Sequence, residues 1–163
     1  MSIHINQDNT VNQGADVDQV DVRGPRFAAW VTTAVLALTV IIAAISPTAA
    51  AVILGLQAAV FAIGAFLGPR RHPYGRLFAT LVAPRLGPAA EREPVPPLKF
   101  AQLVGLVFAA AGTVGFALTV PVLGFVATGF ALFAAFLNAA FGICLGCQIY
   151  PLVARVRHTY AAS

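Results

Sequence analysis

Two long segments without a charged side chain dominate the pattern of apolar and polar positions along this chain. No Asp, Glu, Lys or Arg occurs between Phe27 and Pro69, or between Phe100 and Ala154. About 20 helical residues cross a hydrocarbon core of roughly 30 Å, so each segment is long enough for two spans. In lipid, a helix satisfies every backbone amide within its own segment. The pattern therefore predicts an all-α membrane protein with four transmembrane helices.

A proline in the middle of each segment predicts where one helix ends and the next begins. Pro47 and Pro121 follow short polar or branched stretches, and proline is favoured in the first turn of a helix. The predicted spans are residues 27–46, 49–67, 100–118 and 122–147, which form two helical hairpins joined by a cytoplasmic loop at 69–99. They belong to a transmembrane domain of residues 23–158. A polar leader at 1–22 is expected to be disordered, and 159–163 form a short tail.

Composition supports the membrane assignment and adds an orientation. Apolar residues make up 59% of the chain and charged residues only 10%, with a mean hydropathy of +0.83. An ordinary soluble domain is about one quarter charged. Neither hairpin turn contains a basic residue, and the positive-inside rule then places both termini and the central loop on the cytoplasmic side of the plasma membrane. The ten basic residues are Arg23, Arg26, Arg70, Arg71, Arg76, Arg85, Arg92, Lys99, Arg155 and Arg157.

The net charge of +4 is explained by this orientation, so nucleic acid is not a predicted partner and membrane lipid is. Within the central loop, apolar residues recur at i, i+3, i+4, i+7 and i+8. These residues are Tyr74, Leu77, Phe78, Leu81 and Val82. The spacing favours a short helix lying in the headgroup region. The alternative is a cap folded over the end of the bundle. Residues 86–98 are rich in proline and are expected to form an irregular linker.

The two halves of the chain share the pattern G-x-x-L-G-x-x-x-x-P, at residues 64–73 and 142–151. Both segments fall at the predicted cytoplasmic end of the second helix of a hairpin, so an internal repeat with two hairpins in the same orientation is expected. Glycines four residues apart allow helices to approach closely in lipid. The residues to which the pattern assigns structural roles are Gly64, Gly68, Gly142, Gly146, Pro73 and Pro151.

The most promising chemistry lies in the C-x-x-C formed by Cys144 and Cys147, the only two cysteines. On a helix their spacing places them on one face, where they can form a disulfide or share a soft metal ion. Pro151 is predicted to end or kink the helix beside them. At a helix C-terminus in apolar surroundings, however, the thiolate is disfavoured. The cytoplasm is also reducing, so a permanent disulfide is not expected.

Two interpretations of the pair remain open: two small apolar side chains that pack well, or a redox or sulfur-carrying site. A closed metal site would need further ligands from His72, His158 or a second protomer. In the repeat His72 is aligned with Tyr150, and it could approach the cysteines as a base or a ligand. Otherwise it would simply lie among arginines at the headgroups.

The spans carry few polar residues, which limits the possible functions. Gln57, Gln102 and Asn138 are expected to hydrogen-bond to neighbouring helices. The absence of an ionisable residue at mid-membrane disfavours ion-coupled transport. The sequence contains no P-loop, H-E-x-x-H or G-x-S-x-G motif, so no enzyme class and no cofactor is predicted.

Three segments carry a family resemblance: R-G-P-R-F at 23–27, G-P-R-R-H-P-Y at 68–74, and the stretch at 138–151 that contains C-L-G-C followed by Y-P. Over residues 20–158 the chain resembles the bacterial membrane proteins of domain-of-unknown-function family 4395, which are frequent in actinobacteria. The resemblance implies no established activity. It does imply genes for thioredoxin-like and rhodanese-like proteins nearby, which favours thiol redox or sulfur handling at Cys144 and Cys147.

The leading hypothesis is therefore an accessory membrane protein whose Cys144 and Cys147 exchange electrons or sulfur with a cytoplasmic thioredoxin-like or rhodanese-like partner. His72 is a possible helper. One alternative is a transporter or channel subunit, which would need a homodimer or a larger assembly to form a lumen. Another is a structural subunit of a membrane complex, which would tolerate replacement of the cysteines.

Overall fold

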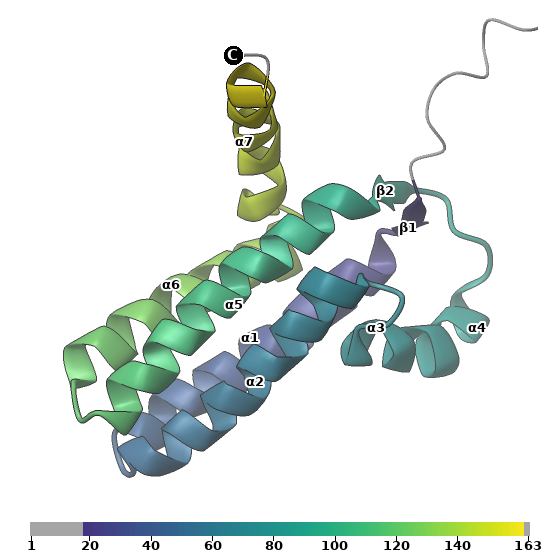
Figure 1. Cartoon of the computed structure of the whole chain (residues 1–163). Helices are drawn as coiled ribbons and strands as arrows, with labels where there is room; N and C mark the ends of the chain where they lie inside the picture. Colours follow the sequence, from purple (N-terminus) through teal and green to yellow (C-terminus); the bar gives the residue numbers. More distant parts are fainter. Residues whose placement is uncertain (1–17, 162–163) are drawn as a thin grey trace, which may run out of the picture.

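Four long helices form the body of the protein in a computed structural model that describes residues 18–161 (Figure 1). They are α1 (Arg23–Ala43), α2 (Pro47–Leu67), α5 (Val95–Ala117) and α6 (Pro121–Phe141). With 21 to 23 residues each, they are long and apolar enough to cross a bilayer. At 1.5 Å per residue each spans about 30 Å. The prediction of an all-α membrane protein with four spans is confirmed.

The four helices form two hairpins whose tight turns lie at the same end of the bundle (Figure 1). Helix α2 packs against α5, and α1 packs against both α6 and α2. Pro47 opens α2 behind Ser46, whose Oγ accepts a hydrogen bond of 3.3 Å from the Ala49 N–H. Pro121 likewise opens α6, behind Val120, which makes no side-chain capping bond. The shorter elements and the basic residues therefore lie at the opposite end, which we call the basic end.

Part of the predicted leader and linker is ordered at the basic end. Strand β1 (Gln19–Asp21) pairs antiparallel with β2 (Arg92–Pro94), and α5 begins at Val95, five residues before the predicted start. The expectation of a wholly disordered leader and an irregular linker was thus wrong for these residues, and residues 1–17 lie outside the described part. The prolines of the linker are compatible with an edge strand and a first helical turn.

The central loop forms a helical segment that packs on the start of α1. It comprises α3 (Pro73–Leu77), the π-helical stretch η2 (Phe78–Val82) and α4 (Ala83–Leu86). The Phe78 ring is buried, 5.8 Å from the ring of Phe27. This segment is helical, as predicted. Phe78 packs on the bundle, whereas Leu77 and Leu81 are exposed, so the position of the segment in the headgroup region stays a prediction.

Close approach at glycines holds the bundle together. Gly115 of α5 contacts Gly124 of α6 so closely that a Cβ at position 115 would lie 2.4 Å from the Gly124 nitrogen. The Phe116 ring covers Gly124, and the Phe61 ring of α2 covers Gly105 of α5 in the same manner. In lipid no hydrophobic force drives helices together, so van der Waals contact must stabilise the association. The glycines make this contact possible.

Large apolar side chains cover the outside of the bundle. Ile41 is 62% exposed, Leu56 66% and Phe130 59%, although each lies within one of the four long helices. Such a surface would be unfavourable in water, but it matches the hydrocarbon of a bilayer. The outward faces and the length of the helices together identify a multi-pass membrane protein.

Replacing Gly115 by alanine should destabilise the bundle, because its Cβ would meet backbone that cannot move aside. We expect a loss of about 1–3 kcal/mol in the free energy of unfolding. The matched control is Gly129→Ala in α6, where a Cβ would meet nothing within 4 Å. Thermal unfolding in detergent should show a lower midpoint for Gly115→Ala only. Equal midpoints for the two variants would contradict the packing described.

Candidate functional site

The fourth span ends at Phe141, six residues earlier than predicted, because Gly142 leaves the helical conformation. Gly142 has φ of +69° in the left-handed region, which glycine adopts without steric cost. Its N–H donates a hydrogen bond of 3.1 Å to the Asn138 carbonyl oxygen, which is a common way to close a helix. Residues 142–147 therefore do not continue α6.

A new helix, α7 (Leu145–Ala161), begins at the cysteines. The carbonyl oxygen of Cys144 accepts the first bond of this helix, 3.1 Å from the Gln148 nitrogen. The Sγ of Cys144 accepts a further bond of 3.2 Å from the Cys147 N–H. Cys144 thus has the position and the role of an N-cap residue. The expectation that the pair lies at a helix C-terminus was wrong, because a left-handed glycine turn separates it from the span.

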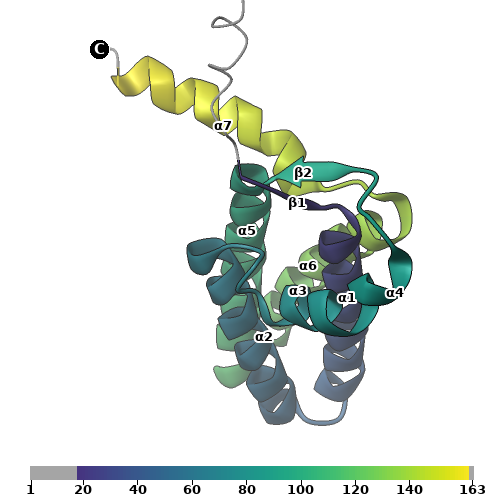
Figure 2. The same ribbon diagram turned by 90° about the vertical axis from the view of Figure 1, so that its right-hand side faces the viewer.

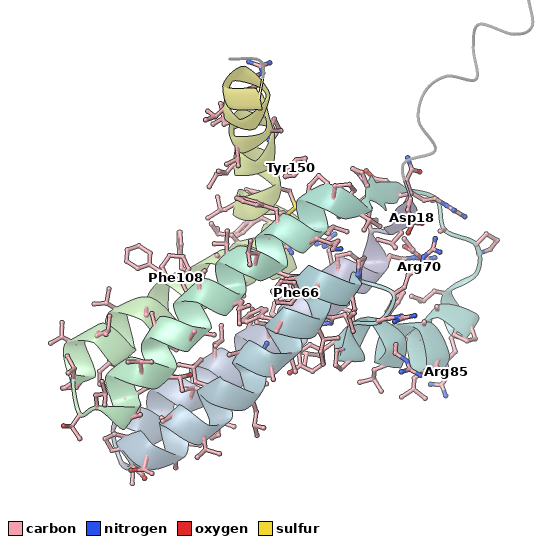
Figure 3. All side chains as sticks on the ribbon, viewed as in Figure 1. Asp18, Phe66, Arg70, Arg85, Phe108 and Tyr150 are labelled. Atoms are coloured by element: carbon pink, nitrogen blue, oxygen red, sulfur yellow. A yellow bond between two sulfur atoms is a disulfide. The ribbon has the colours of Figure 1, made fainter. Side chains whose placement is uncertain are left out.

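Cys144 and Cys147 form a disulfide, with their Cα atoms 5.2 Å apart (Figure 3, yellow). Both residues are half-buried. The spacing left a disulfide and a shared metal ion open, and the structure shows the disulfide. Among the side chains that the structure describes, those of residues 18–156, there is no group of three or more His, Cys, Asp or Glu that could hold a metal ion.

Helix α5 holds the start of α7 in place. A Cβ on Gly146 would lie 2.6 Å from the Ala101 Cα, so the residue directly before Cys147 must be small. The rings of Phe100 and Tyr150 add a contact with centroids 6.0 Å apart. The disulfide is therefore fixed to a transmembrane helix.

Helix α7 turns away from the axis of the bundle and runs across its basic end (Figure 2). Pro151 lies inside α7 and does not end it, contrary to expectation. Near the start of a helix a proline removes only one hydrogen bond, here the one to the Cys147 carbonyl oxygen. Ile149, Leu152 and Val156 are exposed and follow a spacing of i, i+3 and i+7, which gives α7 an apolar outer stripe.

The position of the pair changes its expected chemistry. At a helix N-terminus the unsatisfied backbone N–H groups and the helix dipole stabilise an anion. Reactive cysteines with a lowered pKa are typical of this environment. The dipole, which the sequence interpretation counted against the thiolate, here favours it. Cys144 benefits most, because its sulfur already accepts an N–H bond.

His72 is buried beside Gly64 and Gln102, and no hydrogen bond or ring contact joins it to either cysteine within the described residues. It is 3% exposed, and its ring packs edge-on against Tyr74 with centroids 5.2 Å apart. A Cβ on Gly64 would lie 2.7 Å from the His72 Cδ2, so Gly64 makes room for this ring. The possible role of His72 as a helper of the cysteines finds no support in these contacts.

Burial lowers the pKa of His72 to about 4, although the nearby side chain of Gln102 acts in the opposite direction. The imidazole is therefore neutral at pH 7. Neither the His72 Nε2 nor the Gln102 Oε1 reaches hydrogen-bond geometry with another group. The neighbouring Tyr74 hydroxyl donates a 2.8 Å bond to the Gln57 Oε1, which ties α3 to α2. Burial raises the pKa of Tyr74.

The aligned glycines of the two halves have different roles. Gly68, with φ of +86°, closes α2, and its counterpart in position is Gly142, which closes α6. The sequence pattern instead aligns Gly64 with Gly142 and Gly68 with Gly146. The shared pattern therefore does not mark equivalent positions. Pro73 opens α3 as its first residue, whereas Pro151 lies within α7.

Comparison with known families agrees with the resemblance noted in the sequence. Residues 20–155 match the family model described as "Domain of unknown function (DUF4395)". The chain belongs to this family. No curated protein and no solved structure shows significant similarity to this DUF4395 protein. The family description names no activity, so the function has to be argued from the site itself.

In the reduced protein, Cys144 should react faster than Cys147 with iodoacetamide at pH 7. The thiolate is the reactive form and the start of α7 stabilises it on Cys144, so we expect a rate ratio of about threefold or more. The single variants Cys147→Ser and Cys144→Ser isolate the two thiols, and mass spectrometry follows the alkylation. Equal rates, or faster reaction of Cys147, would show that the start of α7 does not activate Cys144.

His72 should make the protein less stable in acid. Because its folded pKa of about 4 lies below the ordinary 6.5, the unfolded state binds the proton first. The free energy of unfolding is then unaffected above pH 6.5 and falls by about 3 kcal/mol as the pH decreases to 4. Unfolding midpoints of the wild type and of His72→Gln should diverge over this range. Parallel curves for the two proteins would rule out a buried neutral histidine.

Proposed function

We propose that this DUF4395 protein is a thiol–disulfide exchange component of the plasma membrane, with Cys144 and Cys147 as its redox pair. The observation that carries the proposal is the disulfide at the N-terminus of α7, with the Cys144 Sγ accepting the Cys147 N–H. Two cysteines used only for packing would need neither the helix start nor this bond. The contact with α5 fixes the pair to the membrane.

The exchange transfers two electrons between the cysteine pair and one disulfide of a cytoplasmic thioredoxin-like protein. In the reduced protein the Cys144 thiolate attacks a disulfide of a cytoplasmic thioredoxin-like protein, and one partner sulfur leaves as a thiolate. Cys147 then loses its proton and attacks Cys144 in the resulting mixed disulfide. The products are the Cys144–Cys147 disulfide and a reduced partner, which has gained two electrons and two protons. The reverse sequence reduces the pair.

The basic end supports a cytoplasmic orientation. Every arginine and lysine within the described residues lies at this end, as the positive-inside rule requires of cytoplasmic segments. The apolar outer stripe of α7 suits a helix lying in the membrane interface, and the basic side chain of Arg155 is also exposed on this helix. In this arrangement the redox pair faces the compartment where thioredoxin-like and rhodanese-like proteins occur.

Trapping the mixed disulfide tests this function. In Cys147→Ser the second attack cannot occur, so a covalent adduct with a partner should accumulate on Cys144. Cys144→Ser is the matched control and should accumulate far less. The adducts are isolated from cells through a tag and resolved on nonreducing gels, and the partner is identified by mass spectrometry. Absence of a thiol-dependent adduct, together with unchanged redox and sulfur phenotypes in the double serine variant, would overturn the proposal.

The orientation has its own test, since it can fail while the chemistry holds. After mild reduction, a membrane-impermeant maleimide should label the pair in inverted vesicles and leave it unlabelled in intact cells. Cys144→Ser/Cys147→Ser is the background control. Labelling from the cell exterior would place the pair outside the cytoplasm and would exclude a cytoplasmic partner.

A further inference from the structure

A pocket of about 410 Å³ lies at the basic end, between the start of α1, the α3–η2 segment and α5. Most of its wall is apolar. The apolar wall residues include Ala28, Phe78, Ala79, Ala83 and Leu98. None of these belongs to the cysteine site, which packs against Ala101 of α5. The pocket is thus a separate feature of the fold.

Two uncharged polar side chains in the wall have buried atoms without partners. They are the Nε2 of His72 and the Oε1 of Gln102. The His72 side chain belongs to a residue that is only 3% exposed. A buried polar atom left without a hydrogen bond costs about 1–3 kcal/mol. Both atoms could be satisfied by one molecule in the pocket, because the amide oxygen accepts a hydrogen bond and a neutral imidazole can donate or accept.

The charges around the pocket do not select an ionic ligand. Three charged residues belong to the wall. Asp21 is paired with Arg23 at 2.7 Å, Arg70 is paired with Asp18 (Figure 3), and Arg76 is exposed to solvent. His72 itself is neutral at pH 7. The buried part of the wall therefore combines apolar surface with neutral hydrogen-bonding groups, and its position at the end of the membrane helices gives access from the lipid interface.

We propose that this pocket binds an uncharged, lipid-soluble molecule whose head carries a carbonyl or hydroxyl group, as quinones and quinols do. A ligand hydroxyl donates to the Gln102 Oε1, or a ligand carbonyl accepts from the His72 Nε2–H. The apolar body of the ligand fills the space between Ala28, Phe78 and Leu98. This binding does not depend on the proposed thiol exchange, so either can fail without the other.

Two small probes of the same shape test the proposal on the full-length protein in lipid nanodiscs. The first is 2,3-dimethyl-1,4-naphthoquinone, whose methyl groups block addition of thiols to the ring. The second is 2,3-dimethylnaphthalene, which lacks both oxygens. Calorimetric titration, with empty nanodiscs as the blank for partitioning, should show saturable binding of the quinone. Because one hydrogen bond contributes about 1.4 kcal/mol, the hydrocarbon should bind at least about tenfold more weakly.

Variants locate the site. His72→Leu should weaken quinone binding about tenfold or more, because the quinone carbonyl loses its donor, whereas Gln148→Leu, on the exposed surface of α7, should leave it unchanged. Ala79→Phe narrows the pocket from its exposed rim and keeps both polar groups, so it should abolish binding without disturbing the core. Unfolding midpoints confirm that each variant is folded. If His72→Leu does not fold, Ala79→Phe still tests the location of the site.

Three results would overturn the proposal. The first is no saturable binding of the quinone to the wild type. The second is equal binding of quinone and hydrocarbon, which would mark an apolar space that selects no head group. The third is unchanged quinone binding in Ala79→Phe, which would place the site elsewhere. A decanoate titration serves as the charge control, and preference for this anion over the quinone would likewise contradict a neutral site.

Discussion

A helix that has crossed the membrane must stop somewhere, and its last carbonyl groups still need partners. In this protein Gly142 meets that requirement with a left-handed turn, φ +69°, and an N–H bond back to Asn138. A residue with a Cβ would pay a steric cost there. The turn releases Cys144 from α6 and lets it cap α7. Both the chemistry assigned to the cysteines and the direction of α7 depend on this turn.

Helix α5 links the two candidate sites of the molecule. On one side Ala101 contacts Gly146, between the cysteines, and on the other Gln102 lies beside His72 in the pocket wall. These successive residues point about 100° apart around the helix. A shift or rotation of α5 would therefore be felt at both the disulfide and the pocket, even though no direct contact joins them.

Much of the architecture could be predicted from the sequence, and the reasons are physical. Uncharged segments of the right length have few alternatives to helices in lipid, so the four spans and both proline-opened hairpins were predictable. The end of the fourth span was not. The apolar run continues to Ala154, and hydropathy does not register that Gly142 leaves the helix. The burial of His72 was also missed, because it depends on the space that Gly64, in the last turn of the preceding helix, leaves open.

The central claim is that α6 ends at Gly142 and that the cysteines open a second helix turned away from it. Spin labels at the exposed positions Phe133 and Val156, in a background with both cysteines replaced by serine and in nanodiscs, test this claim through their distance. One continuous helix would separate these positions by about 35 Å, at 1.5 Å per residue. We expect a clearly shorter distance, because α7 turns away from the direction of α6. A distance near 35 Å would contradict it.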